Sequence, residues 1–274
     1  MTKPHHESVL SRAARILEAF SQDHPVLTVS EIARRAELPL PTASRLVAEL
    51  VAHGFLRRDE DRGVRIGVRL WELVTRASPA LTLRNAAMPF MEGVHDVVGH
   101  HVQLGVLDGT DVLFLERLSS SDAVINYTRI AGRLPLHVSS SGLVLLAHGP
   151  AELRQRVLEG PLPAYTPCTP ATPSAVRTLL AGIRRQGYAY CPGYLHADAL
   201  GIAAPVRGSD GAVVAALAVI VPDGPAARQV VPVVRTAAVG ISRALGAGGI
   251  NRPAGRHAAG AQRGHDHPGE LPSH

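Results

Sequence analysis

The stretch "LPLPTASRLVAELVAHGFLRR", residues 38–58, decides the fold of the first part of the chain. Its two prolines disfavour helical backbone in the residues before them, and Pro41 suits the first turn of a new helix. The apolar residues that follow recur at helical spacing: Ala43, Leu46, Val47 and Leu50. Gly54 stands where a helix commonly ends in a left-handed residue. The stretch therefore predicts a short amphipathic helix from about residue 41 to 53, preceded by a tight turn.

The flanking segments complete a larger motif. Apolar residues recur at helical spacing from residue 8 to 20, which predicts a first helix. Thr28 and Glu31 have the spacing of a capping box, in which a hydroxyl and a carboxylate each bind a free backbone N–H, so a second helix begins there. After residue 54, two short strand-like runs flank the turn-rich "DEDRG" of residues 59–63, which is typical of a β-hairpin. This order predicts a winged helix-turn-helix domain over residues 1–77.

Such a domain places its third helix in the major groove of DNA, which admits one α-helix. The guanidinium of Arg45 lies on the outward side of that helix and can bind either a guanine or a phosphate. Taken singly, an exposed arginine is more often only a solvated charge, and the acidic residues 59–61 weaken the tip of the hairpin as a phosphate contact. The predicted DNA-binding residues are Thr28, Pro41, Thr42, Ser44, Arg45, Arg57, Arg58 and Arg65.

Bulk properties limit the class of protein. A chain of 274 residues is long enough for two domains. The formal charge of +5 agrees with an anionic partner such as nucleic acid. The N-terminus lacks the features of a secretory signal, and the longest apolar run, residues 211–221, is too short to cross a bilayer. We therefore expect a cytoplasmic protein with no membrane partner. Cys168 and Cys191 do not have the spacing of a disulfide framework or a zinc site, so we expect no metal and no cofactor.

The pattern changes beyond residue 98. The stretch "HVQLGVLDGTDVLFLERL", residues 101–118, has two alternating apolar runs joined by Asp-Gly, a strong hairpin signal. Further strands are predicted at 123–129, 201–206 and 212–221, and helices at 139–147, 150–159, 174–187 and 226–244. Hairpins with separate helices predict an α+β domain with a largely antiparallel sheet over residues 99–246. Residues 78–98 are predicted as a linker helix, and residues 247–274 as a disordered tail.

The chain resembles the IclR-type bacterial transcriptional regulators from about residue 8 to 244. The first part carries the likeness in "LTVSEIARRAELPLPTASRLVAELVAHGFLRRD" and "RIGVRLWEL". The second part carries it in "VQLGVLDGTDVLFLERL", "GRLPLHVSSSGLVLLA" and "GIAAPVRGSDGAVVAALAV". The resemblance implies a winged-helix domain, a linker helix and a GAF-like effector-binding domain. It also implies homodimers or tetramers on palindromic operators in double-stranded DNA.

The best candidate for a ligand pocket is the segment "AGRLPLHVSSSG", residues 131–142. Its three serines stand at the start of a predicted helix, where free amides and hydroxyls suit a carboxylate. Alternatively, Ser139 only caps that helix. The resemblance implies an effector cavity at this junction, and its residues, carried over position by position, are Ala123, Leu134, Ser140, Ser141, Cys191, Leu200, Gly201, Ala218 and Ile220.

The late strand departs from the family pattern. Some members that bind small keto acids have serines there, whereas this chain has Ala218 and Ile220. The cavity is therefore expected to be less polar, and we predict a carboxylate effector with an apolar body, such as an aromatic acid from a catabolic pathway.

The sequence thus predicts a ligand-responsive DNA-binding regulator, a repressor of a catabolic operon that senses a small organic acid. A transcriptional activator of the same type is the alternative. A serine-dependent hydrolase is a remote one, because His137 and the serines of 139–141 lack both a G-x-S-x-G elbow and a placed acid. We expect no enzymatic activity.

Overall fold

A computed structural model of the chain describes residues 7–121, 123–124, 126 and 128–247. The chain divides into two compact units, one up to Leu81 and one from Thr82 onward. The boundary expected at residue 77 lies slightly earlier. The tail expected at 247–274 lies, apart from Ala247, outside the described residues. Within the described part, no helix has the length and apolar character needed to span a bilayer.

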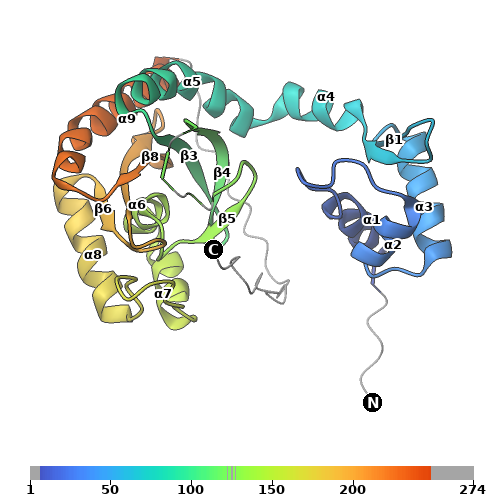
Figure 1. Cartoon of the computed structure of the whole chain (residues 1–274), viewed down its shortest axis with the longest axis horizontal. Helices are drawn as coiled ribbons and strands as arrows, with labels where there is room; N and C mark the ends of the chain where they lie inside the picture. The colour runs from blue at the N-terminus through green and yellow to red at the C-terminus, as the bar shows by residue number, and fades with distance from the viewer. Residues whose placement is uncertain (1–6, 122, 125, 127, 248–274) are drawn as a thin grey trace. The chain divides into compact units, whose positions relative to one another are not determined.

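The first unit is a winged helix-turn-helix (Figure 1). Its elements are α1 (Val9–Glu18), α2 (Val29–Arg35), α3 (Leu40–Ala52), β1 (Leu56–Arg58), β2 (Val64–Ile66) and α4 (Val68–Ala77). The predicted capping box is present at α2: the Glu31 N–H donates to Thr28 Oγ1 at 3.3 Å, and the Thr28 N–H donates to Glu31 Oε2 at 2.7 Å. Gly54 ends α3 with a positive φ of 73°.

One apolar core fixes α3 against its neighbours. Ile16 of α1, Ile32 of α2 and Val47 of α3 are all fully buried in it. The antiparallel hairpin of β1 and β2 closes the core from one side through Leu56 and Val64. The buried side of α3 is thereby set, and its opposite side is left for solvent or a partner.

The second unit is built on a six-stranded antiparallel sheet with the order β5-β4-β3-β8-β7-β6. The strands are β3 (His101–Asp108), β4 (Asp111–Leu118), β5 (Arg133–Pro135), β6 (Ala189–Pro192), β7 (Ala199–Arg207) and β8 (Val213–Pro222). The helices are α5 (Pro79–Val98), which begins in the first unit, α6 (Ser140–His148), α7 (Ala151–Glu159), α8 (Pro173–Gln186) and α9 (Val230–Ala247). The mixed α+β fold with a largely antiparallel sheet is confirmed.

Helices cover both faces of this sheet. One core lies between the sheet and the helices α5 and α9, and the Phe90 ring packs so closely on Gly240 that a Cβ there would lie 2.4 Å from it. The other core lies under α6, with α7 and α8 packed against α6 (Figure 1). The first turn of α6 therefore faces the interior of the unit.

Several elements of the second unit differ from the prediction. The described residues of 123–129 form no strand. The strand that pairs with β4 on its outer side is β5. β6 pairs with β7 although no strand was predicted there. The last helix begins at Val230, after a 3-10 turn over Pro225–Gln229, rather than at residue 226.

β4 contains a bulge that redirects its side chains. Phe114 pairs with Gly105, whereas Glu116 pairs with Leu104, so Leu115 is an extra residue in the ladder. Phe114 consequently packs in the core under α6, while Glu116 is on the face that meets α5.

Candidate DNA interface and effector cavity

The first turn of α3 is exposed on the side away from the core. Pro41, Ser44 and Arg45 are exposed and Thr42 is half-buried. The apolar residues on the opposite side of α3 are buried in the core. The outward residues expected from the sequence thus lie on one side of one helical turn. A helix presented in this way has the form needed to meet base edges.

The start of α3 is open, in contrast to that of α2. Pro39 stands at the capping position and supplies no side-chain hydrogen bond, so the amides of the first turn are not capped by a side chain. Free amides at a helix start favour anions such as phosphate oxygens. The Thr28 hydroxyl, by comparison, serves the capping box of α2 and donates to Glu31 Oε2 at 2.8 Å.

The Arg45 guanidinium is paired within its own helix. Its Nη1 lies 3.0 Å from Glu49 Oε1, and the two side chains are 60% and 52% exposed. An ion pair so exposed contributes only about 0–1 kcal/mol. A guanine or a phosphate can therefore compete for Arg45 at little cost.

The hairpin carries fewer free cations than its sequence suggests. Arg57 and Arg65 lie opposite each other across the strands, and both bind Asp59. The Arg65 Nε–H donates to Asp59 Oδ2 at 2.7 Å. Arg58 is exposed, and no ion pair involves it among the described residues. Of the three arginines predicted to bind DNA here, Arg58 is the one that does not pair with Asp59.

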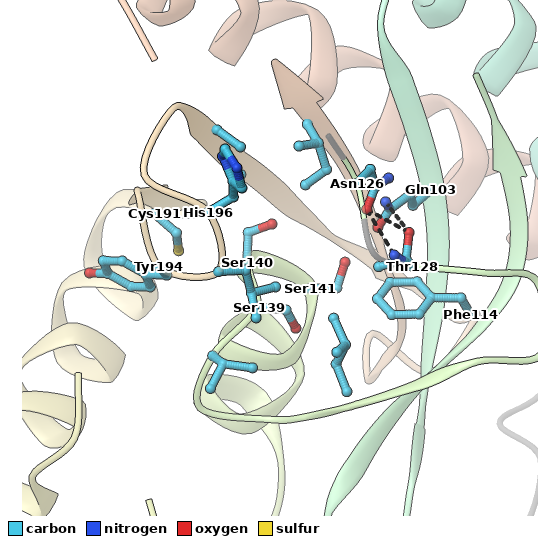
Figure 2. A pocket seen from close by; sticks show the side chains of 16 residues that line it. Gln103, Phe114, Asn126, Thr128, Ser139, Ser140, Ser141, Cys191, Tyr194 and His196 are labelled. Atoms are coloured by element: carbon cyan, nitrogen blue, oxygen red, sulfur yellow. Dashed lines mark hydrogen bonds between the residues drawn. The ribbon is translucent and has the colours of Figure 1, made fainter. Parts of the chain in front are cut away.

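The second unit has a cavity of about 40 Å³ between α6, the sheet and two loops (Figure 2). Predicted residues that line it are Leu134, Ser140, Ser141, Cys191, Gly201 and Ile220. Val138 and Ser139 of the predicted segment 131–142 also line it, and so do residues outside the predicted set: Gln103, Phe114, Asn126, Thr128, Tyr194, Leu195, His196 and Ala199. No Asp, Glu, Lys or Arg side chain is among these lining residues.

Three predicted residues do not line the cavity. Leu200 neighbours Gly201 on β7, and since alternate residues of a strand face opposite sides, it lies in the core under α5 and α9. Ala218 faces the α6 side but is fully buried in the packed core there. Ala123 is half-buried outside the lining.

The start of α6 forms one wall of the cavity. Ser139 caps the helix, because its Oγ accepts from the Gly142 N–H at 3.0 Å. Ser141 is 1% exposed, and its Oγ has no hydrogen-bond partner among the described residues. Gly201 gives the serines room, since a Cβ on it would lie 2.8 Å from the Ser140 Oγ. Ser139 therefore caps the helix, as the alternative interpretation expected, whereas the use of the serines as a carboxylate site stays a prediction.

A chain of hydrogen bonds forms a second polar region. Gln103 Nε2 donates to Thr128 Oγ1 at 2.6 Å, and Thr128 Oγ1 donates to Asn126 Oδ1 at 2.9 Å. Figure 2 shows this cluster to one side of Ser141, with Cys191 and His196 to the other side in this view. In the sequence, Gln103 could have indicated this polar region, because it is a polar residue inside an otherwise apolar predicted strand.

Burial keeps the thiol and the phenol of the lining neutral. Desolvation raises the pKa of the Cys191 thiol, and it raises the pKa of Tyr194 to about 12. A thiol held in its protonated form is a poor nucleophile and a poor redox sensor. A lining without Asp, Glu, Lys or Arg recognises ligands by hydrogen bonds and apolar contact.

The residues that could suggest a hydrolase have structural partners. His137 Nε2 donates to the Pro163 carbonyl at 3.0 Å, and burial lowers the pKa of this histidine. Ser139 is committed to the helix cap. Within the described ranges, no three His, Cys, Asp or Glu side chains gather as metal ligands would.

Comparisons with known proteins agree with this architecture. The family model "IclR helix-turn-helix domain" matches residues 9–60, and "Bacterial transcriptional regulator IclR C-terminal" matches residues 76–243. The HTH-type transcriptional regulator XynR of Escherichia coli is 31% identical over 211 residues, which cover 76% of this chain and 83% of XynR. The transcriptional repressor IclR of the same organism is 26% identical over 185 residues, covering 66% of this chain and 68% of that protein.

A solved structure is more similar still. It is an IclR homolog from Microbacterium hydrocarbonoxydans in complex with 4-hydroxybenzoate, 51% identical, with a TM-score of 0.84. The match covers 88% of this chain and 100% of the solved chain. The two family models together span both units. The chain belongs to the IclR family of DNA-binding transcriptional regulators and is not an enzyme.

Proposed function

We propose that this protein is a repressor of a catabolic operon in the bacterial cytoplasm, and that a small aromatic acid relieves the repression. The observation that carries the proposal is the Ser141 hydroxyl, which is buried at the start of α6 and has no partner in the described part of the chain. A buried polar group left unsatisfied costs about 1–3 kcal/mol, so a ligand that completes it gains that amount.

The effector's carboxylate is proposed to bind at the start of α6. Ser140 and Ser141 offer hydroxyls there, and the first-turn amides of a helix favour an anion. Phe114, Leu134 and Ile220 offer apolar surface for a ring. The related protein in complex with 4-hydroxybenzoate supports this ligand class.

The present volume of the cavity implies that binding involves movement. About 40 Å³ exceeds what one water needs, whereas a cavity of about 150 Å³ accommodates benzene. We expect the loop from Gly193 to Asp198, which carries Tyr194 and His196, to shift outwards as a ring binds. The protein with ligand would then be the more expanded of the two forms at this loop.

β4 gives the effector a physical connection to α5. Arg117 donates to the Thr128 carbonyl beside the cavity, and the backbone N–H of Arg117 donates to Glu116 Oε1 at 2.9 Å. Glu116 is buried and accepts from Arg84 Nε of α5 at 2.6 Å. We propose that a ligand shifting the segment around Thr128 changes this pairing and hence the state of α5. The operator affinity would change by the difference in ligand affinity between the two states.

The DNA-binding unit is proposed to act as a dimer or tetramer on a palindromic operator. Two copies of α3 would occupy successive major grooves, about 34 Å apart. The exposed apolar side chains of α4 support self-association: Val68 is 70%, Trp71 61% and Val74 45% exposed. A second copy of the same chain would cover them.

A gel shift on the chain's own promoter region, with and without aromatic acids, tests the proposal. We expect a specific complex that benzoate-like acids weaken, and that pyruvate-sized acids weaken less. Tighter binding of pyruvate by calorimetry would contradict the choice of ligand class. Deleting the gene should raise transcription of the target operon, whereas a fall would make the protein an activator.

A further inference from the structure

Asn126 has an amide whose orientation the structure fixes. Its Oδ1 lies 3.0 Å from the backbone nitrogen of Thr128, which can only donate. The atom facing that nitrogen must therefore be the oxygen, and Nδ2 is the other end of the amide. Nδ2 is buried and has no hydrogen-bond partner among the described residues.

The neighbouring groups cannot satisfy this nitrogen. Since Asn126 Oδ1 is an acceptor, the Thr128 hydroxyl spends its only proton on it at 2.9 Å. Thr128 in turn accepts from Gln103 Nε2 at 2.6 Å. The direction of each hydrogen bond in this chain is thus assigned, and Asn126 Nδ2 is left without an acceptor among the described residues. An amide nitrogen can only donate, so its partner must be an acceptor atom.

The composition of the lining restricts what that acceptor can be. A second carboxylate would bury another negative charge where no Lys or Arg side chain lines the cavity. A neutral oxygen, such as a phenol hydroxyl or a carbonyl, needs no counter-charge. Gln103, whose nitrogen is already used, retains its amide oxygen as an acceptor for a phenol proton.

We propose that Asn126 is a specificity-determining residue that donates from Nδ2 to a neutral oxygen on the effector. The effector is then a hydroxy- or oxo-substituted aromatic monocarboxylate, with its carboxylate at Ser140 and Ser141 and its second oxygen at Asn126. The assignment of Asn126 rests on the proposed function, because it takes an aromatic acid as the ligand. The observations behind the assignment are separate from those behind the proposed function, since Asn126 lies outside α6.

Calorimetry on the full chain tests the proposal with matched ligands. The probes are benzoate, the three hydroxybenzoates and the three methylbenzoates, because a methyl group has nearly the size of a hydroxyl and cannot accept a hydrogen bond. For at least one ring position we expect the hydroxy acid to bind about 10-fold more tightly than its methyl counterpart. Equal affinities at every position would overturn the assignment.

Two variants should then separate the two ends of the ligand. Asn126→Leu should abolish the preference for the hydroxy acid and leave benzoate affinity within about 2-fold. Ser141→Ala should instead weaken every acid by a similar factor. If Asn126→Leu retains the preference, Asn126 does not read the second oxygen.

A third variant guards against misfolding. Asn126→Asp keeps an acceptor for the Thr128 N–H and hydroxyl but replaces the donor with an oxygen, so the preference should also disappear. Binding of no aromatic acid to the unaltered protein would refute the proposed ligand class. Binding of these acids without a hydroxyl preference would refute only the role of Asn126.

Discussion

The two units hold their functional groups in opposite surroundings. In the first, Arg45, Arg57 and Arg65 are charged and solvent-accessible, and nearby acids balance them. In the second, no Asp, Glu, Lys or Arg lines the cavity among the described residues, and the Ser141 hydroxyl and the Asn126 amide nitrogen are buried there without described partners. The first surface depends on charge, which salt screens. The second depends on hydrogen bonds shielded from water. DNA and effector recognition should therefore respond to different perturbations.

The largest effect is expected for Gly142→Ala in the second unit. A Cβ at Gly142 would lie 2.5 Å from the Leu136 carbonyl oxygen, so the start of α6 must move. We expect a loss of about 3 kcal/mol of stability and of effector binding, with the first unit unaffected. Calorimetric unfolding measures this.

Gly182→Ala is the matched control for that change. Gly182 is also within a helix, α8, but nothing lies within 4 Å of a Cβ placed there. Alanine should stabilise the unit by about 0.5–1 kcal/mol. Similar losses from both variants would show that the crowding at Leu136 is not the cause.

Next in size is the effect of Arg45→Ala in the first unit. Operator binding should weaken by about 1–3 kcal/mol if Arg45 contacts a base, and the loss should be confined to the specific operator. An equal loss on unrelated DNA would identify a phosphate contact. Glu49→Gln, which releases Arg45 from its ion pair, should not weaken binding. Fluorescence anisotropy at two salt concentrations measures each case.

A smaller effect is expected for Thr28→Ala. The substitution removes the hydroxyl that accepts from the Glu31 N–H, and loss of such a cap costs about 1 kcal/mol. Only the first unit should lose stability. Emission of Trp71, the one tryptophan of the chain, follows that unit, whereas all five tyrosines lie in the second. Thr178→Ala, in α8, is the control and should leave the Trp71 transition unchanged.

The smallest and most gradual effect should come from pH. Burial lowers the pKa of His101, His137 and His148, all in the second unit, below the ordinary value of 6.5. The unfolded chain then binds more protons than the folded one, so these groups favour folding above pH 6.5 and lose that effect as the pH falls.

The first unit should respond in a different pH range. The hydrogen bonds from Thr28 lower the pKa of Glu31, so this contribution is present above pH 4.5 and is lost below it. Near-UV circular dichroism of the tyrosines should thus report weakening between pH 7 and 5.5 while Trp71 emission reports none. Parallel weakening of both signals would contradict this difference.

The sequence predicted the first unit better than the cavity. The capping box, the proline turn and Gly54 act through neighbours in the chain, so their spacing alone locates α2 and α3. The hairpin of β3 and β4 was equally local. The family resemblance assigned Leu200 to the cavity, but the residue lies on the other face of β7. Because β7 is apolar on both faces, periodicity cannot tell which face a residue takes. Asn126 and Thr128 were missed because their roles depend on Gln103, which is far away in the chain.

The bulge at Leu115 has a consequence for how β4 tolerates changes in length. One additional residue lets Phe114 contact the cavity while Glu116 contacts Arg84 on the opposite side of the sheet. Deleting Leu115 would remove the bulge and make Phe114 and Glu116 neighbours, and neighbouring residues of a regular strand face opposite sides. Phe114 would still face the cavity and Glu116 would still face Arg84. β4 can therefore lose this one residue without exchanging inside for outside, whereas ligand recognition and the charge balance of α5 both depend on which sides these two residues take.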